Sequence, residues 1–238
     1  MTQHSNTLAG STAIVTGASR GFGRGIAEAF IAAGANVVGV ARSGGTVTAD
    51  AADPATAHRL IDEYQPRTVV LCAGAAPQMS ALHEQTWESF SQNWNVDVAQ
   101  AFHWITEALR RPLAPGSTVI AVSSGAAVNG SPLSGGYAGA KATVRFITAY
   151  AALESQRAGL GIDFVSVLPT LTPATELGAK AVAAYAERQG ADVETFVQSL
   201  PPALTAEQVG KSVLELATAG PSEHRAYMLS SAGLAPLG

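Results

Sequence analysis

Short apolar segments alternate with longer helix-like segments along this chain, and this alternation restricts the fold more than any other feature. The apolar segments have the length of buried strands, and the segments between them have the length of helices. Such alternation is typical of a parallel sheet that helices cover on both faces. The predicted strands are Thr12–Thr16, Asn36–Ala41, Thr68–Cys72, Thr118–Ser123, Asp163–Leu168 and Tyr227–Leu229.

Helix-like segments fill the intervals between these strands, and the last of them opens with Thr205 and Gln208 at the spacing of a capping box. A chain of 238 residues, 47% of them hydrophobic, can bury one sizeable core. No linker or repeat divides it, so we expect a single domain over 1–238 with a loose tail at 1–9. The predicted helices are 22–33, 54–64, 84–111 with a break near Gln92, 135–158, 173–199 in two pieces, and 206–219.

The connection after the second predicted strand is too short for a helix. Only the residues from Arg42 to Asp50 separate that strand from the next turn and helix, whereas a helical crossover needs about a dozen residues. We therefore predict that 43–50 forms a loop or a stub of strand, with no helix. Asp50 is then expected at the same edge of the sheet as Arg42.

A glycine-rich turn follows the first predicted strand and leads directly into a helix. Its sequence is Thr16-Gly17-Ala18-Ser19-Arg20-Gly21-Phe22-Gly23. Glycines let the backbone of such a turn approach a pyrophosphate, whose charge the helix N-terminus favours. The alternative is a turn without a ligand, but a strand before it, a helix after it and a second strand ending near 41 are the context of a dinucleotide site.

The end of the second predicted strand indicates which dinucleotide binds there. NAD sites usually place a carboxylate at this point to bind the ribose 2′-hydroxyl, and NADP sites use arginine. The sequence Val40-Ala41-Arg42-Ser43 contains no acid. Arg42, supported by Arg20, is therefore expected to pair with a 2′-phosphate, which favours NADP(H) over NAD(H). The alternative is that Arg42 is only an exposed loop cation.

A serine, a tyrosine and a lysine form a candidate catalytic set. Ser124 follows the predicted strand Thr118–Ser123, and Tyr137 and Lys141 share one face of the next helix because they are four residues apart. A phenol with a pKa of about 10 is a poor acid–base group at neutral pH, but a nearby ammonium stabilises its phenolate. Ser124 is placed to hydrogen-bond a substrate oxygen and hold it toward the Tyr137 hydroxyl.

With these residues in this order and spacing, the chain from about Gly10 to Leu234 resembles the short-chain dehydrogenase/reductase family. The shared features are Thr16-Gly17-x-x-x-Gly21-x-Gly23, Asn95-Val96, Ser124 and Tyr137-x-x-x-Lys141. The resemblance implies a Rossmann-type doubly wound sheet, here without the helix between strands 2 and 3. It also implies an oxidoreductase that acts on CH–OH or C=O groups with NAD(P).

The resemblance further implies a role for each catalytic residue. Tyr137 would be the general acid/base, Lys141 would lower its pKa and hold the nicotinamide ribose, and Ser124 would polarise the substrate. Asn95, otherwise a surface helical residue, would interrupt its helix and organise a water that leads protons to Lys141. The expected cofactor contacts are Gly17, Ser19, Arg20, Gly21, Phe22, Gly23, Ala41, Arg42, Ser43, Asp50, Ala51, Ala73, Gly74, Ala75, Tyr137, Lys141, Pro169, Thr170 and Thr172.

Two segments depart from the family pattern. The family commonly carries Asn-Asn-Ala-Gly where this chain has Leu71-Cys72-Ala73-Gly74. We interpret Cys72 as a small buried hydrophobe rather than a nucleophile. The usual Pro-Gly after the sixth strand is Pro169-Thr170, so the loop geometry on the nicotinamide side is expected to differ, with Thr172 or Thr175 as candidates to bind the carboxamide.

The resemblance places a variable substrate lid at 170–200. This segment offers apolar side chains and no clear clamp for a phosphate or carboxylate, so we expect a mostly apolar or neutral carbonyl substrate. Ordinary core packing is the alternative explanation for these side chains. The apolar lid residues are Leu171, Leu177, Val182, Tyr185, Phe196 and Val197, the opposite wall is expected from Ala126, Val128 and Leu133, and the expected substrate contacts are Ser124, Ala126, Tyr137 and Leu171.

The composition limits which classes of partner, which cysteine-based sites and which cellular compartment we expect. A formal net charge of −4 without a basic tract gives no indication of nucleic acid or of an anionic membrane as a partner. A single cysteine excludes an internal disulfide and a multi-cysteine metal site, so no metal is expected. No apolar run is long enough to span a membrane, and cytoplasmic is the default interpretation.

Helices 94–111 and 137–157 are apolar on more than one face, and in the family such helices pair, so a homodimer or homotetramer is expected.

Two other functions remain open from the sequence. The altered Asn-Asn-Ala-Gly and Pro-Gly segments are compatible with an NADP(H)-binding sensor or scaffold that performs no chemistry. An epimerase or dehydratase on the same fold would retain its cofactor without net consumption of NADPH. The intact serine, tyrosine and lysine set favours the oxidoreductase over both.

Overall fold

Eight strands form one sheet in the order β3-β2-β1-β4-β5-β6-β7-β8, in a computed structural model that describes residues 8–237. All neighbouring strands run parallel except β8, which pairs antiparallel with β7. The order reverses between β1 and β4, and this is where a doubly wound sheet opens a crevice. The strands are β1 (Thr12–Thr16), β2 (Asn36–Ala41), β3 (Val47–Thr48), β4 (Thr68–Leu71), β5 (Thr118–Val122), β6 (Asp163–Pro169), β7 (Ala226–Ser230) and β8 (Gly233–Leu237).

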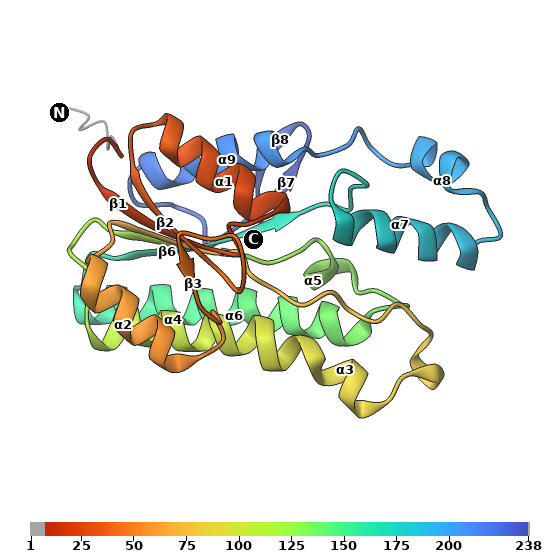
Figure 1. Ribbon diagram of the computed structural model, residues 1–238, viewed down its shortest axis with the longest axis horizontal. Coiled ribbons are helices and arrows are strands. Elements are labelled where there is room, and N and C mark those ends of the chain that lie inside the picture. Colours follow the sequence, from red (N-terminus) through yellow and green to blue (C-terminus); the bar gives the residue numbers. More distant parts are fainter. Residues whose placement is uncertain (1–7, 238) are drawn as a thin grey trace.

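Helices cover both faces of this sheet (Figure 1). Helices α1 and α9 lie on one face, and α2, α4 and α6 lie on the other, while α7 and α8 extend beyond one end of the sheet. The helices are α1 (Gly21–Ala32), α2 (Pro54–Tyr64), α3 (Trp87–Asn93), α4 (Ala99–Arg110), α5 (Ala126–Asn129), α6 (Gly135–Ala158), α7 (Glu176–Arg188), α8 (Val193–Ser199) and α9 (Ala206–Thr218), with a 3-10 helix η1 (Leu82–Glu84) and a π-helix η2 (Trp94–Val98).

Alternating side chains of the central strands supply two separate cores. In β1, Ile14 packs toward α2, α4 and α6, whereas Val15 packs toward α1 and α9. The same alternation makes β4 contribute Val69 to the first core and Val70 to the second. A strand buried on both faces must be apolar at successive positions, so these strands appear in the sequence as unbroken apolar runs.

The predicted fold class is confirmed, and so is the absence of a helix after β2. Residues 43–50 contain only the two-residue strand β3, which pairs parallel with β2. Because Ala41 pairs with Thr48, the chain leaves β3 at the edge of the sheet where it also leaves β2. Asp50 therefore returns to the edge at which Arg42 lies, as the length of the connection predicted.

Several features differ from the prediction, among them the short helix α5, which was not predicted. The interruption of the helix expected over 84–111 is the π-helix η2, not a break near Gln92. Strand β8 was not predicted, because Pro236 within it lowers the strand signal, and proline is tolerated only at such an edge. Leu8, which was expected in a loose tail, is 3% exposed and packs in the core beside α1 and α9. The rest of that tail, 1–7, lies outside the described residues.

No helix within residues 8–237 is both long and apolar enough to cross a membrane.

Helices α1 and α9 touch through their backbones. A Cβ atom added to Gly25 of α1 would lie 2.2 Å from the backbone oxygen of Ala206, and one added to Gly210 of α9 would lie 2.3 Å from the oxygen of Gly25. No side chain fits at either position, since backbone atoms cannot rotate away. This contact fixes how closely α1 packs against α9.

We predict that Gly25→Ala lowers the free energy of unfolding by about 1–3 kcal/mol, because the new methyl group forces the two helices apart. Urea denaturation of the purified variant measures this change. The matched control is Gly139→Ala in α6, where the added Cβ would meet the Trp94 ring at an ordinary 3.7 Å. That control is expected to match or exceed wild-type stability, since alanine favours a helix over glycine. Equal stability of the two variants would contradict the packing argument.

Candidate active site

A cavity of about 1120 Å³ lies at the carboxyl ends of the strands, beside the point where the strand order reverses. The glycine turn, the ends of β2, β4, β5 and β6, the first turns of α6 and the start of α7 all line it. Every residue predicted to be catalytic, to bind the cofactor or to contact the substrate borders this cavity except Asn95. The sequence therefore identified residues from distant segments that the fold brings to one place.

The glycine turn fits a dinucleotide phosphate. Gly17 has φ +69°, and a Cβ there would lie 2.8 Å from the Cα atom of Ala73, so only glycine allows this approach of β1 to the loop after β4. A Cβ on Gly23 would lie 2.2 Å from the oxygen of Gly17. Helix α1 begins without a side-chain cap and without an acidic residue in its first turn. Its free N–H groups and its dipole thus face the cavity as an anion site.

Two arginines near the adenosine side differ in their surroundings. Arg20 pairs with Glu176 at the start of α7, with Nη1 and Oε2 2.8 Å apart, and both side chains are exposed. Within residues 8–237, Arg42 makes no ion pair or side-chain hydrogen bond and borders the cavity together with Ser43, Asp50 and Ala51. The free guanidinium of Arg42 is therefore the group that can meet an added phosphate without giving up a partner.

The three predicted catalytic residues all border the cavity. Ser124 follows β5, and its Oγ accepts a hydrogen bond from the Ala126 N–H at 3.2 Å, which leaves its own hydrogen free to donate. Tyr137 and Lys141 lie one turn apart on α6, and Lys141 Nζ is 5.7 Å from the centre of the Tyr137 ring. The Ser123 hydroxyl donates to the backbone oxygen of Lys141 and so ties α6 to the end of β5.

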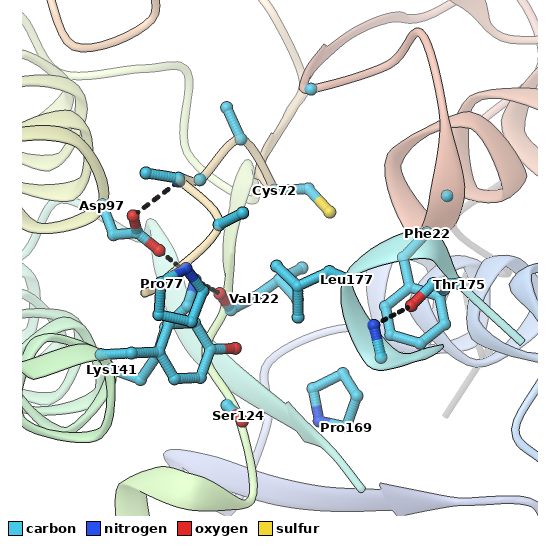
Figure 2. Close-up of a pocket in the computed structure, with 18 of the residues that line it drawn as sticks. Phe22, Cys72, Pro77, Asp97, Val122, Ser124, Lys141, Pro169, Thr175 and Leu177 are labelled. Carbon is cyan, nitrogen blue, oxygen red and sulfur yellow. Dashed lines mark hydrogen bonds and ion pairs between the residues drawn. The ribbon is translucent and has the colours of Figure 1, made fainter. Parts of the chain in front are cut away.

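Lys141 is buried and carries its charge against a carboxylate. Its Nζ lies 2.9 Å from Oδ1 of Asp97, close but off the ideal hydrogen-bond direction, and it donates to the Val122 oxygen at 3.1 Å (Figure 2). Burial acts to lower the pKa of Lys141, but the attraction of Asp97 outweighs it, so this pKa lies above its usual value. Lys141 is therefore an ammonium across the whole range in which enzymes usually operate.

Asn95 does not take part in this arrangement. It is exposed and does not border the cavity, so the prediction that it organises a water leading to Lys141 is wrong. The position next to Lys141 belongs to Asp97, which is 1% exposed and lies in the π-helix η2. A π turn adds a residue to the helical turn and often occurs at functional sites.

The sequence does contain a signal for Asp97. The inward positions of this stretch repeat at intervals of three or four residues, as on one face of a helix. Asp97 belongs to this series and Asn95 falls outside it. The buried members are Asn93, Asp97, Gln100, Ala101, Trp104, Ile105 and Ala108.

The loop after β4 is held by side chains rather than by the family's second asparagine. Thr16 Oγ1 accepts from the backbone N–H groups of Cys72 and Ala73, and Gln100 Nε2 donates to the Ala73 oxygen. A Cβ on Gly74 would lie 2.7 Å from Asp97 Oδ1, so the ion pair leaves room only for glycine there. Desolvation raises the pKa of the Cys72 thiol to about 11, which keeps it protonated and unreactive at neutral pH.

On the nicotinamide side, the hydroxyls of both candidate threonines already form hydrogen bonds within the protein. Thr172 Oγ1 donates to the Leu204 oxygen at 3.0 Å, and Thr175 Oγ1 accepts from the Gly178 N–H as the cap of α7. The backbone of Thr170 donates to the Leu229 oxygen. These bonds fix the loop after β6 and set its shape without the usual glycine.

The substrate end of the cavity combines apolar and uncharged polar groups. Of the predicted wall residues, Ala126, Leu171, Leu177 and Tyr185 line it, whereas Val128 and Leu133 do not. Val182 and Phe196 pack within the lid itself. The Tyr185 hydroxyl hydrogen-bonds Ser131 Oγ and so connects α7 to the loop before α6. The lining residues that sequence reasoning did not assign to the site include Gln92, Asp97, Gln100, Asn129, Ser131, Ser134 and Lys180.

No group of three or more potential metal-ligating side chains occurs within residues 8–237.

Comparison with known proteins agrees with this geometry. Residues 17–222 match a family profile described as enoyl-(acyl carrier protein) reductase. Sorbitol dehydrogenase of Cereibacter sphaeroides is 26% identical over 179 residues, which cover 67% of this chain and 70% of that protein. L-xylulose reductase of Bos taurus is 28% identical over 182 residues, which cover 70% and 74%.

A crystal structure assigned as an NAD(P)-dependent gluconate 5-dehydrogenase of Beutenbergia cavernae superposes with a TM-score of 0.75 and 25% identity, covering 90% of this chain and 92% of that one. The family profile spans most of the chain, and the glycine turn, Ser124, Tyr137 and Lys141 border one cavity. This chain belongs to the short-chain dehydrogenase/reductase family, and it is an oxidoreductase that acts on CH–OH or C=O groups with a nicotinamide dinucleotide.

Proposed function

We propose that this protein is an NADP(H)-dependent enzyme that reduces a carbonyl, or oxidises a secondary alcohol, of a small neutral or mostly apolar substrate. The observation that carries the proposal is the convergence of Ser124, Tyr137 and Lys141 on the cavity that begins at the glycine turn. A protein that only sensed the dinucleotide would have no use for a phenol and a buried ammonium at the far end of its binding site.

The chain's own groups account for the movement of the proton. A bound nicotinamide supplies or accepts the hydride. In reduction, the Tyr137 hydroxyl gives its proton to the substrate oxygen, and Lys141 stabilises the phenolate that remains. In oxidation, the phenolate takes the proton from the substrate hydroxyl. The Ser124 hydroxyl, whose hydrogen is free, donates a hydrogen bond to the same substrate oxygen and stabilises the negative charge that develops on this oxygen.

The choice of NADP(H) depends on Arg42. It borders the cavity after β2, no acid follows that strand directly, and its guanidinium has no partner within residues 8–237. Paired guanidinium and phosphate groups form strong, charge-assisted hydrogen bonds. The structural neighbour from Beutenbergia cavernae, which has NADP bound at low occupancy, supports the same choice.

Uncharged hydrogen-bonding groups support a neutral substrate. Asn129, Ser131 and Ser134 border the cavity beside the apolar Ala126 and Leu171. The lid charges Glu176 and Lys180 pair with each other at 2.9 Å. Because relatives are named for sorbitol and L-xylulose, we propose neutral polyhydroxylated ketones and alcohols as the first compounds to screen.

The outer faces of α4 and α6 support assembly as a homodimer or homotetramer. Phe102 on α4 is 53% exposed, and Phe146, Tyr150 and Leu153 on α6 are 52%, 60% and 59% exposed. Large apolar side chains gathered on neighbouring helices mark a surface that another protein chain covers. We propose that a second copy of this chain covers it.

We predict that Tyr137→Phe lowers turnover by about 10²- to 10⁴-fold, because it removes the proton donor and leaves the ring in place. The assay is NADPH consumption with a panel of carbonyl compounds. Thermal stabilisation by NADPH should persist in the variant, since the glycine turn and Arg42 are intact. The control is Tyr64→Phe, the same change at the end of α2, where the side chain does not border the cavity. Unchanged turnover in Tyr137→Phe would refute the proposed function.

We also predict that Arg42→Ala weakens NADPH binding about 10- to 100-fold, the range expected for loss of a hydrogen bond to a charged group, and leaves NADH binding nearly unchanged. Calorimetric titration with each dinucleotide measures both affinities. The control is Arg24→Ala, an exposed arginine on α1 that pairs with Glu28. Equal losses for NADPH and NADH, or no loss for either, would show that Arg42 does not bind a 2′-phosphate.

A further inference from the structure

The contact between Asp97 and Lys141 joins four segments around the phenol. Asp97 Oδ1 faces Lys141 Nζ at 2.9 Å, and the two side chains are 1% and 7% exposed. Oδ2 of Asp97 accepts from the Ala75 N–H at 3.0 Å and from Asn93 Nδ2 at 3.1 Å. Asn93 Nδ2 also donates to the Ala75 oxygen at 2.8 Å. The carboxylate is thus fixed by the loop after β4 and by α3, while Lys141 is held from α6 and the end of β5.

The charges that surround Tyr137 nearly cancel. From its own helix it meets the Lys141 ammonium, which in turn faces the Asp97 carboxylate of η2. The Cys72 thiol after β4 borders the same cavity and is neutral below its raised pKa of about 11. From the lid, the Tyr185 hydroxyl hydrogen-bonds Ser131, while the Glu176 carboxylate is shared between Lys180 and Arg20. One buried positive charge and one buried negative charge therefore lie next to each other beside the phenol.

We propose that Asp97 is a positioning residue that sets the pH range of the reaction. The Asp97 carboxylate holds the Lys141 ammonium and offsets the positive charge of that ammonium. Tyr137 therefore keeps its proton to a more alkaline pH. This inference rests on the proposed role of Tyr137 as acid/base. The enzyme then works at neutral pH mainly as a proton donor, which suits carbonyl reduction. Alcohol oxidation needs the phenolate and gains rate only at alkaline pH.

A purely structural role for Asp97 makes a different prediction. If the carboxylate only held the loop at Ala75, its replacement by an amide of the same shape would disturb stability but not the titration of a neighbouring phenol. The amide oxygen of Asp97→Asn still accepts from the Ala75 N–H. Its NH₂ group then faces Lys141, and because both groups are donors, the ammonium is released toward Tyr137 with its charge uncompensated.

In the Asp97→Asn variant, the rate of alcohol oxidation should rise, and the rate of carbonyl reduction should fall, at a pH that is about 1–2 units lower than in the wild type. One nearby charge usually has an effect of this size. The profiles of kcat/KM are measured in both directions with saturating NADP⁺ or NADPH. Asp97→Ser is a second neutral variant in case the amide does not fold. Profiles that coincide with the wild type would overturn the proposal.

A second measurement does not depend on turnover. Phenolate formation is followed by ultraviolet difference absorbance during an alkaline titration, and subtraction of the Tyr137→Phe background isolates Tyr137 among the five tyrosines. In the Asp97→Asn background this signal should appear about 1–2 pH units lower than in the wild type. If it does while Tyr137→Phe retains turnover, the proposed function fails and the control of the reaction's pH range fails with it, whereas the effect of Asp97 on the Tyr137 hydroxyl still stands.

The matched control is Asp163→Asn. Asp163 is another mostly buried carboxylate with a cationic partner, since its side chain is 10% exposed and lies 3.5 Å from Arg225. It begins β6 and so lies at the opposite edge of the sheet from the cavity. Its replacement should leave both the pH profiles and the Tyr137 titration unchanged. An equal shift in this control would show that the effect of Asp97→Asn is not local and would overturn the proposal.

Discussion

The parallel arrangement of β1 to β7 is the constraint on which the rest of the molecule depends. Parallel neighbours end at the same edge of a sheet, so each strand delivers its following loop to one side. Because the order reverses between β1 and β4, the chain continues to opposite faces of the sheet after these two strands, and a crevice opens beside their carboxyl ends. The glycine turn, Arg42, Ser124 and Pro169 reach this crevice from four strands, although they are far apart in the chain.

Burial on both faces explains why so much of the fold was predictable. Strands covered on two sides must be apolar throughout, and the helices between them carry one apolar face, so both kinds of segment leave a strong periodic signal. The glycine turn and the spacing of Tyr137 and Lys141 are local patterns, and they too could be recognised. The missing helix before α2 followed from chain length alone. By contrast, β8 is a single edge strand interrupted by Pro236, and its pairing gives no such signal.

Asn95 shows where this kind of reasoning fails. A motif assigns a role to a residue by its position in the sequence. Which side chain reaches Lys141, however, depends on which residues lie on the inward face of the helix. Asp97 lies on the inward series that runs from Asn93 to Gln100, and Asn95 lies outside it. Asp97 and Lys141 then meet from helices that are distant in sequence, and neither residue predicts the other. Bringing two charges out of water is costly unless each is also hydrogen-bonded, and here Ala75, Asn93 and the Val122 oxygen supply those bonds.

The fit between Gly74 and Asp97 has a consequence for how this site can change during evolution. A methyl group at position 74 would meet the carboxylate at 2.7 Å, so any larger residue there requires Asp97 to move or shrink first. Conversely, once position 74 carries a side chain, aspartate can no longer be restored at 97 in its present position. The two positions therefore exclude each other, so a descendant of this protein keeps a carboxylate beside its catalytic lysine only while position 74 remains glycine.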